Sequence, residues 1–321
     1  MMLIVLLHTV FDEVELRGVY VICEIATPVF FFISSYLLFQ HWNLSWHCYS
    51  RKLISRIKSL WIPFVIFNSL IIPYYYIKTY WLPIPNQREL PLSFSDTITS
   101  CLFGIPETLN SPLWFVRELL VFVVFSPIVG WIVMRGKYVT GAVFILVLTL
   151  GHYASYYSIL YWLPCLILGC CCALYEKEVL HLLTYIKRRN WAKWLITITF
   201  FGGLIIASHN LQQASDQYIP YYIYRLSAPI WMVLLYTLYD RILPERLVSN
   251  VRPYTFFIYC THTLFINIVN TIIKNMFPVL PCEWNRTIVF VISFVLVTYT
   301  GKILCHFKPL WMVLTGFRSY R

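Results

Sequence analysis

Long apolar runs recur along the whole chain and constrain its fold more than any other feature. Of the 321 residues, 59% are hydrophobic and only 12% are charged, whereas a soluble domain has about 25% charged residues. A helix needs roughly 20 apolar residues to cross a bilayer. The runs, bounded by charge or proline, are 1–11, 18–39, 57–77, 112–134, 139–151, 156–174, 192–209, 219–239, 254–274 and 286–305. The sequence therefore predicts an all-α integral membrane protein, a bundle of about ten transmembrane helices.

The distribution of Lys and Arg predicts how this bundle is oriented, because cytoplasmic loops carry an excess of these residues. With a cytoplasmic N-terminus, 18 of the 25 lie on the inner side and five on the outer side, while Arg117 and Arg225 fall within runs. We therefore expect both termini in the cytoplasm. The net charge of +11 follows from the same bias, and it indicates contact with anionic lipid headgroups rather than with nucleic acid.

The organisation of the chain predicts a single transmembrane domain over 1–321 without a soluble domain, because no long polar block interrupts the runs. The first run is about half as long as a spanning helix, and it lacks the basic start and the cleavage site of a signal peptide. We expect this first helix to be truncated at its N-terminus. The ten cysteines lie mostly in or beside runs, where free cysteine behaves as a small hydrophobe. No metal-binding or phosphate-loop motif is present, so the sequence predicts no bound metal or cofactor.

His8 is the first candidate for chemistry, because an ionisable side chain at membrane depth is costly and is a functional-site hypothesis. Asp12 follows four residues later, a spacing at which both side chains share one face of a helix. A carboxylate near an imidazole orients it and raises its basicity, as a general base requires. The alternative is a buried histidine bonded to a backbone carbonyl, with Asp12 in the outer loop.

Four more charged residues enter apolar runs. Glu24 lies within about two turns of the outer end of the second run, where it either pairs with an intramembrane arginine or is wetted at the interface. Arg117 and Glu118 enter the fourth run, and Arg225 enters the eighth. All of these charges need partners, and a polar cavity inside a bundle requires such a sparse set of buried polar groups.

A basic segment, SRKLISRIKSLWIPF, leads into the third run. Its Arg51, Lys52, Arg56 and Lys58 recur at helical spacing. Such a cluster either holds a phosphorylated cytoplasmic ligand or serves only as a positive-inside anchor. Arg56 is the best placed to turn inward, because it lies closest to the start of the run.

Two residues in aromatic segments complete the candidates. Trp114, in SPLWFVRELL, is either a site residue or an aromatic residue at the membrane interface. His262, in TFFIYCTHTLFI, is either another site member or a hydrogen-bonding residue of helix packing.

The order of these segments resembles the membrane-bound acyltransferase-3 family, whose members O-acylate sugars of surface polysaccharides, lipopolysaccharide and related glycans. The resemblance covers nearly the full length. The matching pieces are His8 at the end of the first apolar segment, PVFFFISSYLLF at 28–39, RKLISRIKSLWIPF at 51–64, LWFVRELL at 113–120 and TFFIYCTHTLFI at 255–266.

The chain departs from the family pattern at two places. Ser34 and Ser35 stand where the family usually has Ser-Gly in the second span. The family's first span also carries an arginine well before the histidine, at a position that here would precede Met1. This second departure agrees with the expectation of a truncated first helix.

The resemblance implies an enzyme of a bacterial cytoplasmic membrane that moves an acyl group, most often acetyl, from cytoplasmic acyl-CoA to a hydroxyl of a cell-surface or lipid-linked glycan. It implies that His8 is the general base or a transient acyl acceptor. The expected partners are then acyl-CoA, the glycan and membrane lipids, with no bound cofactor. Two alternatives stay open: a non-enzymatic flippase or carrier of a lipid-linked oligosaccharide, and a glycan polymerase.

These arguments define two sets of candidate site residues. The candidate catalytic residues are His8, Asp12 and Glu24. The candidate substrate-binding residues are Arg51, Arg56, Trp114, Arg117, Glu118, Arg225 and His262.

Overall fold

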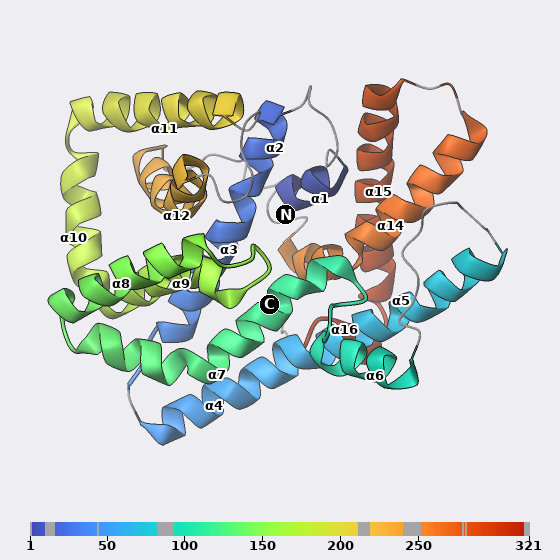
Figure 1. Cartoon of the computed structure of the whole chain (residues 1–321), viewed down its shortest axis with the longest axis horizontal. Coiled ribbons are helices and arrows are strands. Elements are labelled where there is room, and N and C mark those ends of the chain that lie inside the picture. The colour runs from blue at the N-terminus through green and yellow to red at the C-terminus, as the bar shows by residue number, and fades with distance from the viewer. Residues whose placement is uncertain are drawn as a thin grey trace. The chain divides into compact units, whose positions relative to one another are not determined.

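The regular structure of the described chain is helical throughout (Figure 1). The computed structural model describes residues 2–9, 17–43, 45–81, 93–210, 219–239, 252–277, 279 and 281–317. Within these residues, six helical segments are long and apolar enough to cross a membrane. They are Val19–Phe39, Trp46–Ile77, Ser111–Met134, Asn190–Ala207, Arg252–Met276 and Trp284–Leu304.

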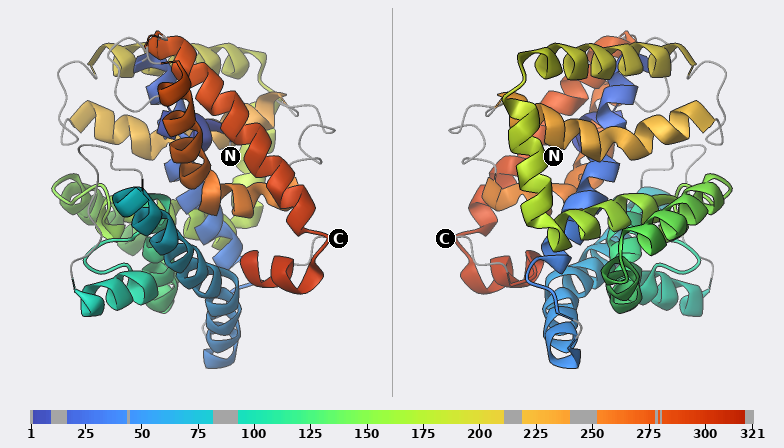
Figure 2. Two further views of the ribbon diagram at one scale, coloured as in Figure 1. Left: turned by 90° about the vertical axis from the view of Figure 1, so that its right-hand side faces the viewer. Right: turned by 90° about the vertical axis from the view of Figure 1, so that its left-hand side faces the viewer.

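A seventh span is counted if helices α9 (Ile159–Leu174) and α10 (Glu176–Lys187) form one broken segment, which bends by 93° (Figure 2). The predicted all-α membrane class is therefore confirmed, with six to seven candidate spans. Of the remaining runs, α8 (Lys137–His152) is a shorter apolar helix and α1 covers only Met2–Thr9. The count of about ten stays a prediction.

The chain divides into two compact units whose segments alternate along the sequence. Unit 1 comprises Met1–Thr9, Leu53–Val121 and Ser249–Arg321, and unit 2 comprises Val10–Lys52 and Phe122–Val248. Two of the four boundaries, after Lys52 and after Val121, fall inside the helices α4 and α7. Neither unit is a continuous stretch of sequence, and the single domain stays a prediction.

Unit 1 is built around α14 (Thr255–Met276) and α15 (Cys282–Leu304), which lie side by side (Figure 2). The short helix α1 packs against both of them. Helix α5 (Ile62–Trp81) packs against α14, and α6 (Phe94–Phe103) packs against α5. The histidine-bearing turn of α14 is thereby enclosed by other helices of its own unit.

A π-helical segment, Ile57–Trp61, joins α4 (Trp46–Arg56) to α5. Gly316, which follows α16 (Lys308–Leu314), packs directly on it with a φ of +70°. A Cβ at this glycine would clash with the carbonyl group of Ser59, so the close approach of the two backbones requires glycine. Single π turns inside α-helices frequently mark functional sites, and this one begins directly after Arg56.

Unit 2 is centred on α3 (Ala26–Phe39), which packs against α9. Gly169 makes this contact close, because a Cβ there would clash with the carbonyl oxygen of Phe32. The Ser35 hydroxyl donates a hydrogen bond of 2.5 Å to the carbonyl oxygen of Leu166 on α9. Small residues and hydroxyl hydrogen bonds are typical of helix contacts in membranes. The serine that replaces the family's usual glycine is therefore accommodated by a glycine on the opposite helix.

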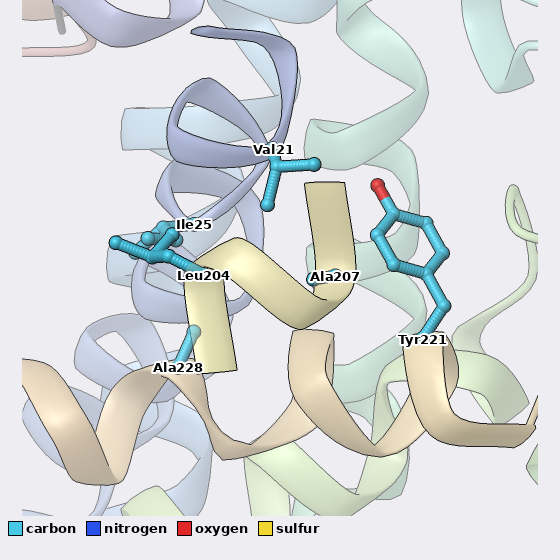
Figure 3. Packing of buried hydrophobic residues seen from close by; sticks show 6 residues of the cluster. All are labelled: Val21, Ile25, Leu204, Ala207, Tyr221 and Ala228. Carbon is cyan, nitrogen blue, oxygen red and sulfur yellow. The ribbon is translucent and has the colours of Figure 1, made fainter. Parts of the chain in front are cut away.

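A second core region of unit 2 joins α2 (Arg17–Glu24), α11 (Asn190–Asn210) and α12 (Ile219–Tyr239). The second apolar run forms one candidate span, Val19–Phe39, in which a single turn residue, Ile25, separates α2 from α3 while keeping α-helical backbone angles (φ −56°, ψ −27°). The buried residues of this region are Val21, Ile25, Leu204, Ala207, Tyr221 and Ala228 (Figure 3).

Candidate functional site

His8 and His262 lie next to each other in unit 1. Their ring centroids are 4.9 Å apart and the ring planes are tilted by 53°. His262 is fully buried, whereas His8, in the last turn of α1, is half-buried. The buried neighbours Val5 and Leu7 hold α1 against α14 and α15. The structure thus brings together two of the histidines that the sequence singles out.

The hydrogen bonds of His262 define its tautomer. Its Nδ1 lies 2.7 Å from the carbonyl oxygen of Tyr259 and 3.2 Å from that of Ile258. Because a carbonyl oxygen only accepts, Nδ1 carries the hydrogen and Nε2 of the neutral ring is an acceptor. These bonds stay within α14, so they do not join two helices.

The Nε2 atom of His262 is buried, and within the described part of the chain it has no hydrogen-bond partner. A buried polar atom without a partner costs about 1–3 kcal/mol. Such an atom in a native protein calls for an explanation. In unit 1, the Nε2 atom of His262 is thus a buried hydrogen-bond acceptor in a ring that lies beside the ring of His8.

A polar network ties the segment before α7 (Trp114–Met134) to the same turn of α14. The backbone N–H of Asn110 donates to Oδ1 of Asn68 at 3.0 Å, and the Asn110 side chain donates to the carbonyl oxygen of Cys260 at 2.8 Å. Thr263 donates to Oδ1 of Asn110 at 3.2 Å. Sequence reasoning missed both asparagines, although Asn68 lies inside the third apolar run, where an amide side chain is a detectable signal.

Trp114 stands at the start of α7 and is half-buried. Its ring contacts that of Phe115, which contacts the ring of Tyr259 with centroids 5.9 Å apart. The Tyr259 hydroxyl donates to the carbonyl oxygen of Pro112. The aromatic start of α7 is therefore anchored to α14 through Tyr259, one turn from His262.

Arg117 and Glu118 satisfy each other. Arg117 Nη2 lies 2.7 Å from Glu118 Oε1, and Nε donates to the same oxygen at 2.8 Å. Arg117 Nη1 also donates to the carbonyl oxygen of Gly104 at 3.0 Å. Gly104 adopts a φ of +69° at the end of α6, so the arginine connects the end of α6 to the beginning of α7.

The basic segment separates into residues with different surroundings. Lys52 Nζ donates to two carbonyl oxygens at the C-terminal end of α3, at 2.6 and 2.8 Å, which is a helix-capping role. Arg51 is exposed and, like Lys52, belongs to unit 2. Arg56 is half-buried beside the π-helical segment, Lys58 is exposed, and both belong to unit 1.

Glu24 and Arg225 form a buried ion pair in unit 2. Arg225 Nε lies 2.6 Å from Oε2 of Glu24, and Nη2 lies 2.9 Å from Oε1. Tyr221 donates to Oε2, Tyr20 donates to Oε1 at 2.9 Å, and Arg225 Nη1 donates to the hydroxyl of Tyr161 at 3.0 Å. Of the two alternatives for Glu24, the structure shows pairing with an arginine, although α12, which carries Arg225, is not among the six candidate spans of the described residues.

Aromatic rings complete the surroundings of this pair. The guanidinium group of Arg225 lies 4.2 Å from the ring centroid of Tyr221 and 5.0 Å from that of Tyr156. Bidentate pairing, hydroxyl contacts and cation–π stacking together satisfy the charge. Sequence reasoning did not identify these tyrosines. Asp12, the predicted partner of His8, lies outside the described residues.

Comparison of the sequence with known protein families gives a match over nearly the whole chain. A family model described as an acyltransferase domain, that of the acyltransferase-3 family, matches residues 1–306. The chain belongs to the acyltransferase-3 family. This acyltransferase-3 protein is thus a multi-pass membrane acyltransferase, and the match runs through both of its units. No curated protein and no solved structure matches the chain.

Proposed function

We propose that this acyltransferase-3 protein moves an acyl group, most often acetyl, from cytoplasmic acyl-CoA to a hydroxyl of a cell-surface or lipid-linked glycan. Membership of the family supports acyl transfer. The observation that carries the proposed reacting centre is the contact between His8 and the fully buried His262. A half-buried imidazole held by its own unit is suited to work as a general base or as an acyl acceptor.

Two routes use His8 in this reaction. In the first, a ring nitrogen of His8 takes the proton of the acceptor hydroxyl while the oxygen attacks the thioester carbonyl. The carbon–sulfur bond breaks, and the proton then passes to the CoA thiolate. In the second, this nitrogen itself attacks the thioester, the carbon–sulfur bond breaks and the CoA thiolate leaves. The acceptor hydroxyl then takes the acyl group from the acyl-imidazolium, and the hydroxyl proton passes to the thiolate. Both routes restore neutral His8.

For the donor, we propose that Arg56 binds CoA phosphate groups, with Lys58 beside it. Arg56 is half-buried next to a π-helical segment, and Lys58 follows it in the same unit. Charge-assisted hydrogen bonds from guanidinium groups suit phosphate oxygens. Lys52 is excluded from this role, because its ammonium group caps α3.

We further propose a single domain with about ten spanning segments and both termini in the cytoplasm of a bacterial cell. The placement of 18 of the 25 Lys and Arg residues on one side supports this orientation. In this arrangement the basic segment before α5 faces the cytoplasm, where acyl-CoA is found. The enzyme then belongs to the cytoplasmic membrane.

The surroundings of the buried charges favour acyl transfer over the carrier alternative. A carrier of charged lipid-linked sugars needs buried charges that are available to its cargo. Arg117 instead pairs with Glu118, and Arg225 pairs with Glu24. Both arginines thus have protein partners.

Mass spectrometry of surface glycans from cells with and without this chain tests the proposal. We expect loss of the chain to remove an ester-linked acyl mass while leaving glycan length and surface display unchanged. Shortened glycans would instead support a polymerase. Glycans retained inside the cell would support a flippase, and either result would contradict the proposed function.

A further inference from the structure

We propose that His262 is a positioning residue for His8: its Nε2 accepts a hydrogen bond from the ring N–H of His8 while the other nitrogen of His8 takes part in acyl transfer. The proposal rests on the proposed function. It assigns a role to a histidine that the family resemblance leaves without one.

The orientation of the His262 ring is fixed by its own helix. Its Nδ1 faces the carbonyl oxygens of Tyr259 and Ile258, one turn earlier on α14. In histidine, Nε2 is the ring nitrogen farther from Cβ and its lone pair diverges widely from the direction of the Nδ1 hydrogen, so Nε2 faces away from the carbonyl groups that Nδ1 binds. A lone pair is thereby directed away from these carbonyl groups, and the full burial of His262 shields it from water.

No group among the described residues donates a hydrogen bond to Nε2 of His262. The atom is buried and has no hydrogen-bond partner within them. The ring of Tyr259 lies 6.1 Å from that of His262, but its hydroxyl donates to Pro112. A buried acceptor that has no partner among the described residues is suited to a donor that approaches during the reaction.

His8 lies next to His262. Its ring centroid lies 4.9 Å from that of His262, so a small rotation brings an N–H of one ring to a nitrogen of the other. Hydrogen bonds between catalytic groups often become short only when the substrate is bound. The tilt of 53° between the planes allows an N–H in the plane of one ring to point at the edge of the other.

The chemical consequence concerns the tautomer of His8. If one nitrogen donates its hydrogen to His262, the other nitrogen carries the lone pair and faces the acceptor hydroxyl or the thioester. When His8 takes the hydroxyl proton, its positive charge is stabilised by the lone pair of Nε2. His262 stays neutral throughout, and the proton leaves His8 for the CoA thiolate.

Two substitutions of His262 separate its two nitrogens. In His262→Gln, the side-chain oxygen reaches the position of Nε2 and keeps an acceptor there. In His262→Asn, the shorter amide reaches the position of Nδ1 and keeps the hydrogen bond to Tyr259, but it leaves no acceptor near His8. His181→Asn, an exposed histidine on α10, is the control.

The measurement is the transfer of isotopically labelled acetyl from acetyl-CoA to glycan in membranes that contain the full chain, at equal amounts of each folded variant. We expect His262→Asn to lower kcat at least about tenfold with KM for acetyl-CoA within about twofold of wild type, and His262→Gln to recover most of that loss. We expect no further loss when His262→Asn is combined with His8→Ala. His181→Asn should transfer acetyl at the wild-type rate.

Three results would overturn the proposal. Equal kcat for wild type, His262→Asn and His262→Gln in membranes where His8→Ala is inactive would remove the role of His262 and leave the proposed function intact. Loss through a raised KM at unchanged kcat would make His262 a substrate-binding residue instead. Transfer that survives His8→Ala would overturn the proposed role of His8, and this inference with it.

Discussion

Arg225 binds Glu24 through two hydrogen bonds, Nε to Oε2 at 2.6 Å and Nη2 to Oε1 at 2.9 Å. The arginine and glutamate side chains are only 2% and 3% exposed. Glu24 directly precedes Ile25, the single turn residue between α2 and α3. Through this ion pair the candidate span Val19–Phe39 is joined to α12 within unit 2.

Removing one partner of this pair should destabilise the protein strongly. Glu24→Gln leaves a buried guanidinium without its counter-charge, a change that costs about 3–5 kcal/mol in buried pairs. We expect a clear fall in the thermal unfolding temperature of the detergent-solubilised protein. Glu178→Gln, on an exposed position of α10, is the matched control and should unfold like wild type. An unfolding temperature of Glu24→Gln equal to that of the control would contradict the structural role.

The contact of α3 with α9 gives a second prediction. Gly169→Ala places a methyl group against the backbone of Phe32 and Tyr36, and overpacking of this kind costs about 1–3 kcal/mol. Gly141→Ala, also within a helix, meets no atom within 4 Å, and alanine there should stabilise α8 by up to about 1 kcal/mol. Thermal unfolding of both variants in the same detergent measures the difference. If Gly169→Ala were as stable as Gly141→Ala, that result would contradict the close packing of α3 against α9.

The split of the basic segment gives a third prediction. Arg56→Gln should raise KM for acetyl-CoA about tenfold, because a lost charge-assisted hydrogen bond costs about 1.5–3 kcal/mol. Lys52→Gln should instead lower the unfolding temperature and leave that KM unchanged, since Lys52 caps α3. Steady-state kinetics with acetyl-CoA, together with thermal unfolding, separates the two effects. Equal KM values for Arg56→Gln and wild type would remove Arg56 from the donor site.

Much of the helical framework could be predicted from the apolar runs. The eighth run, 219–239, has the same bounds as α12, and 192–209 lies within α11. The turn at Ile25 and the π-helical segment after Arg56 were not predicted, because hydropathy records the length of a run and not its internal hydrogen bonding. Gly316 and Ser59 are also far apart in the sequence, so no local sequence pattern predicts their close approach.

The candidate site was predicted in part for a similar reason. A charge in an apolar run shows that a partner is needed, and this led to Glu24, Arg117, Glu118 and Arg225. The identity of the partner depends on the packing of distant helices. Lys52 shares helical spacing with Arg56, yet it turns to the end of α3.

The tyrosines around Arg225 were missed because tyrosine is common in this chain, with 24 residues. A single sequence does not show which of them meet the ion pair. Asn110 was missed because it lies outside the apolar runs, where an amide is unremarkable, although it binds the turn that carries His262. Long-range contacts thus account for most of what the sequence did not predict in the site.

The most direct measurement compares membranes that contain wild type with membranes that contain His8→Ala at equal expression. The quantity measured is the rate at which labelled acetyl passes from acetyl-CoA into the glycan fraction. We expect His8→Ala to lower this rate at least about 100-fold, since positioned acid–base groups contribute roughly 10²–10⁴-fold. A His8→Ala protein that acetylates the glycan at the wild-type rate would contradict the account.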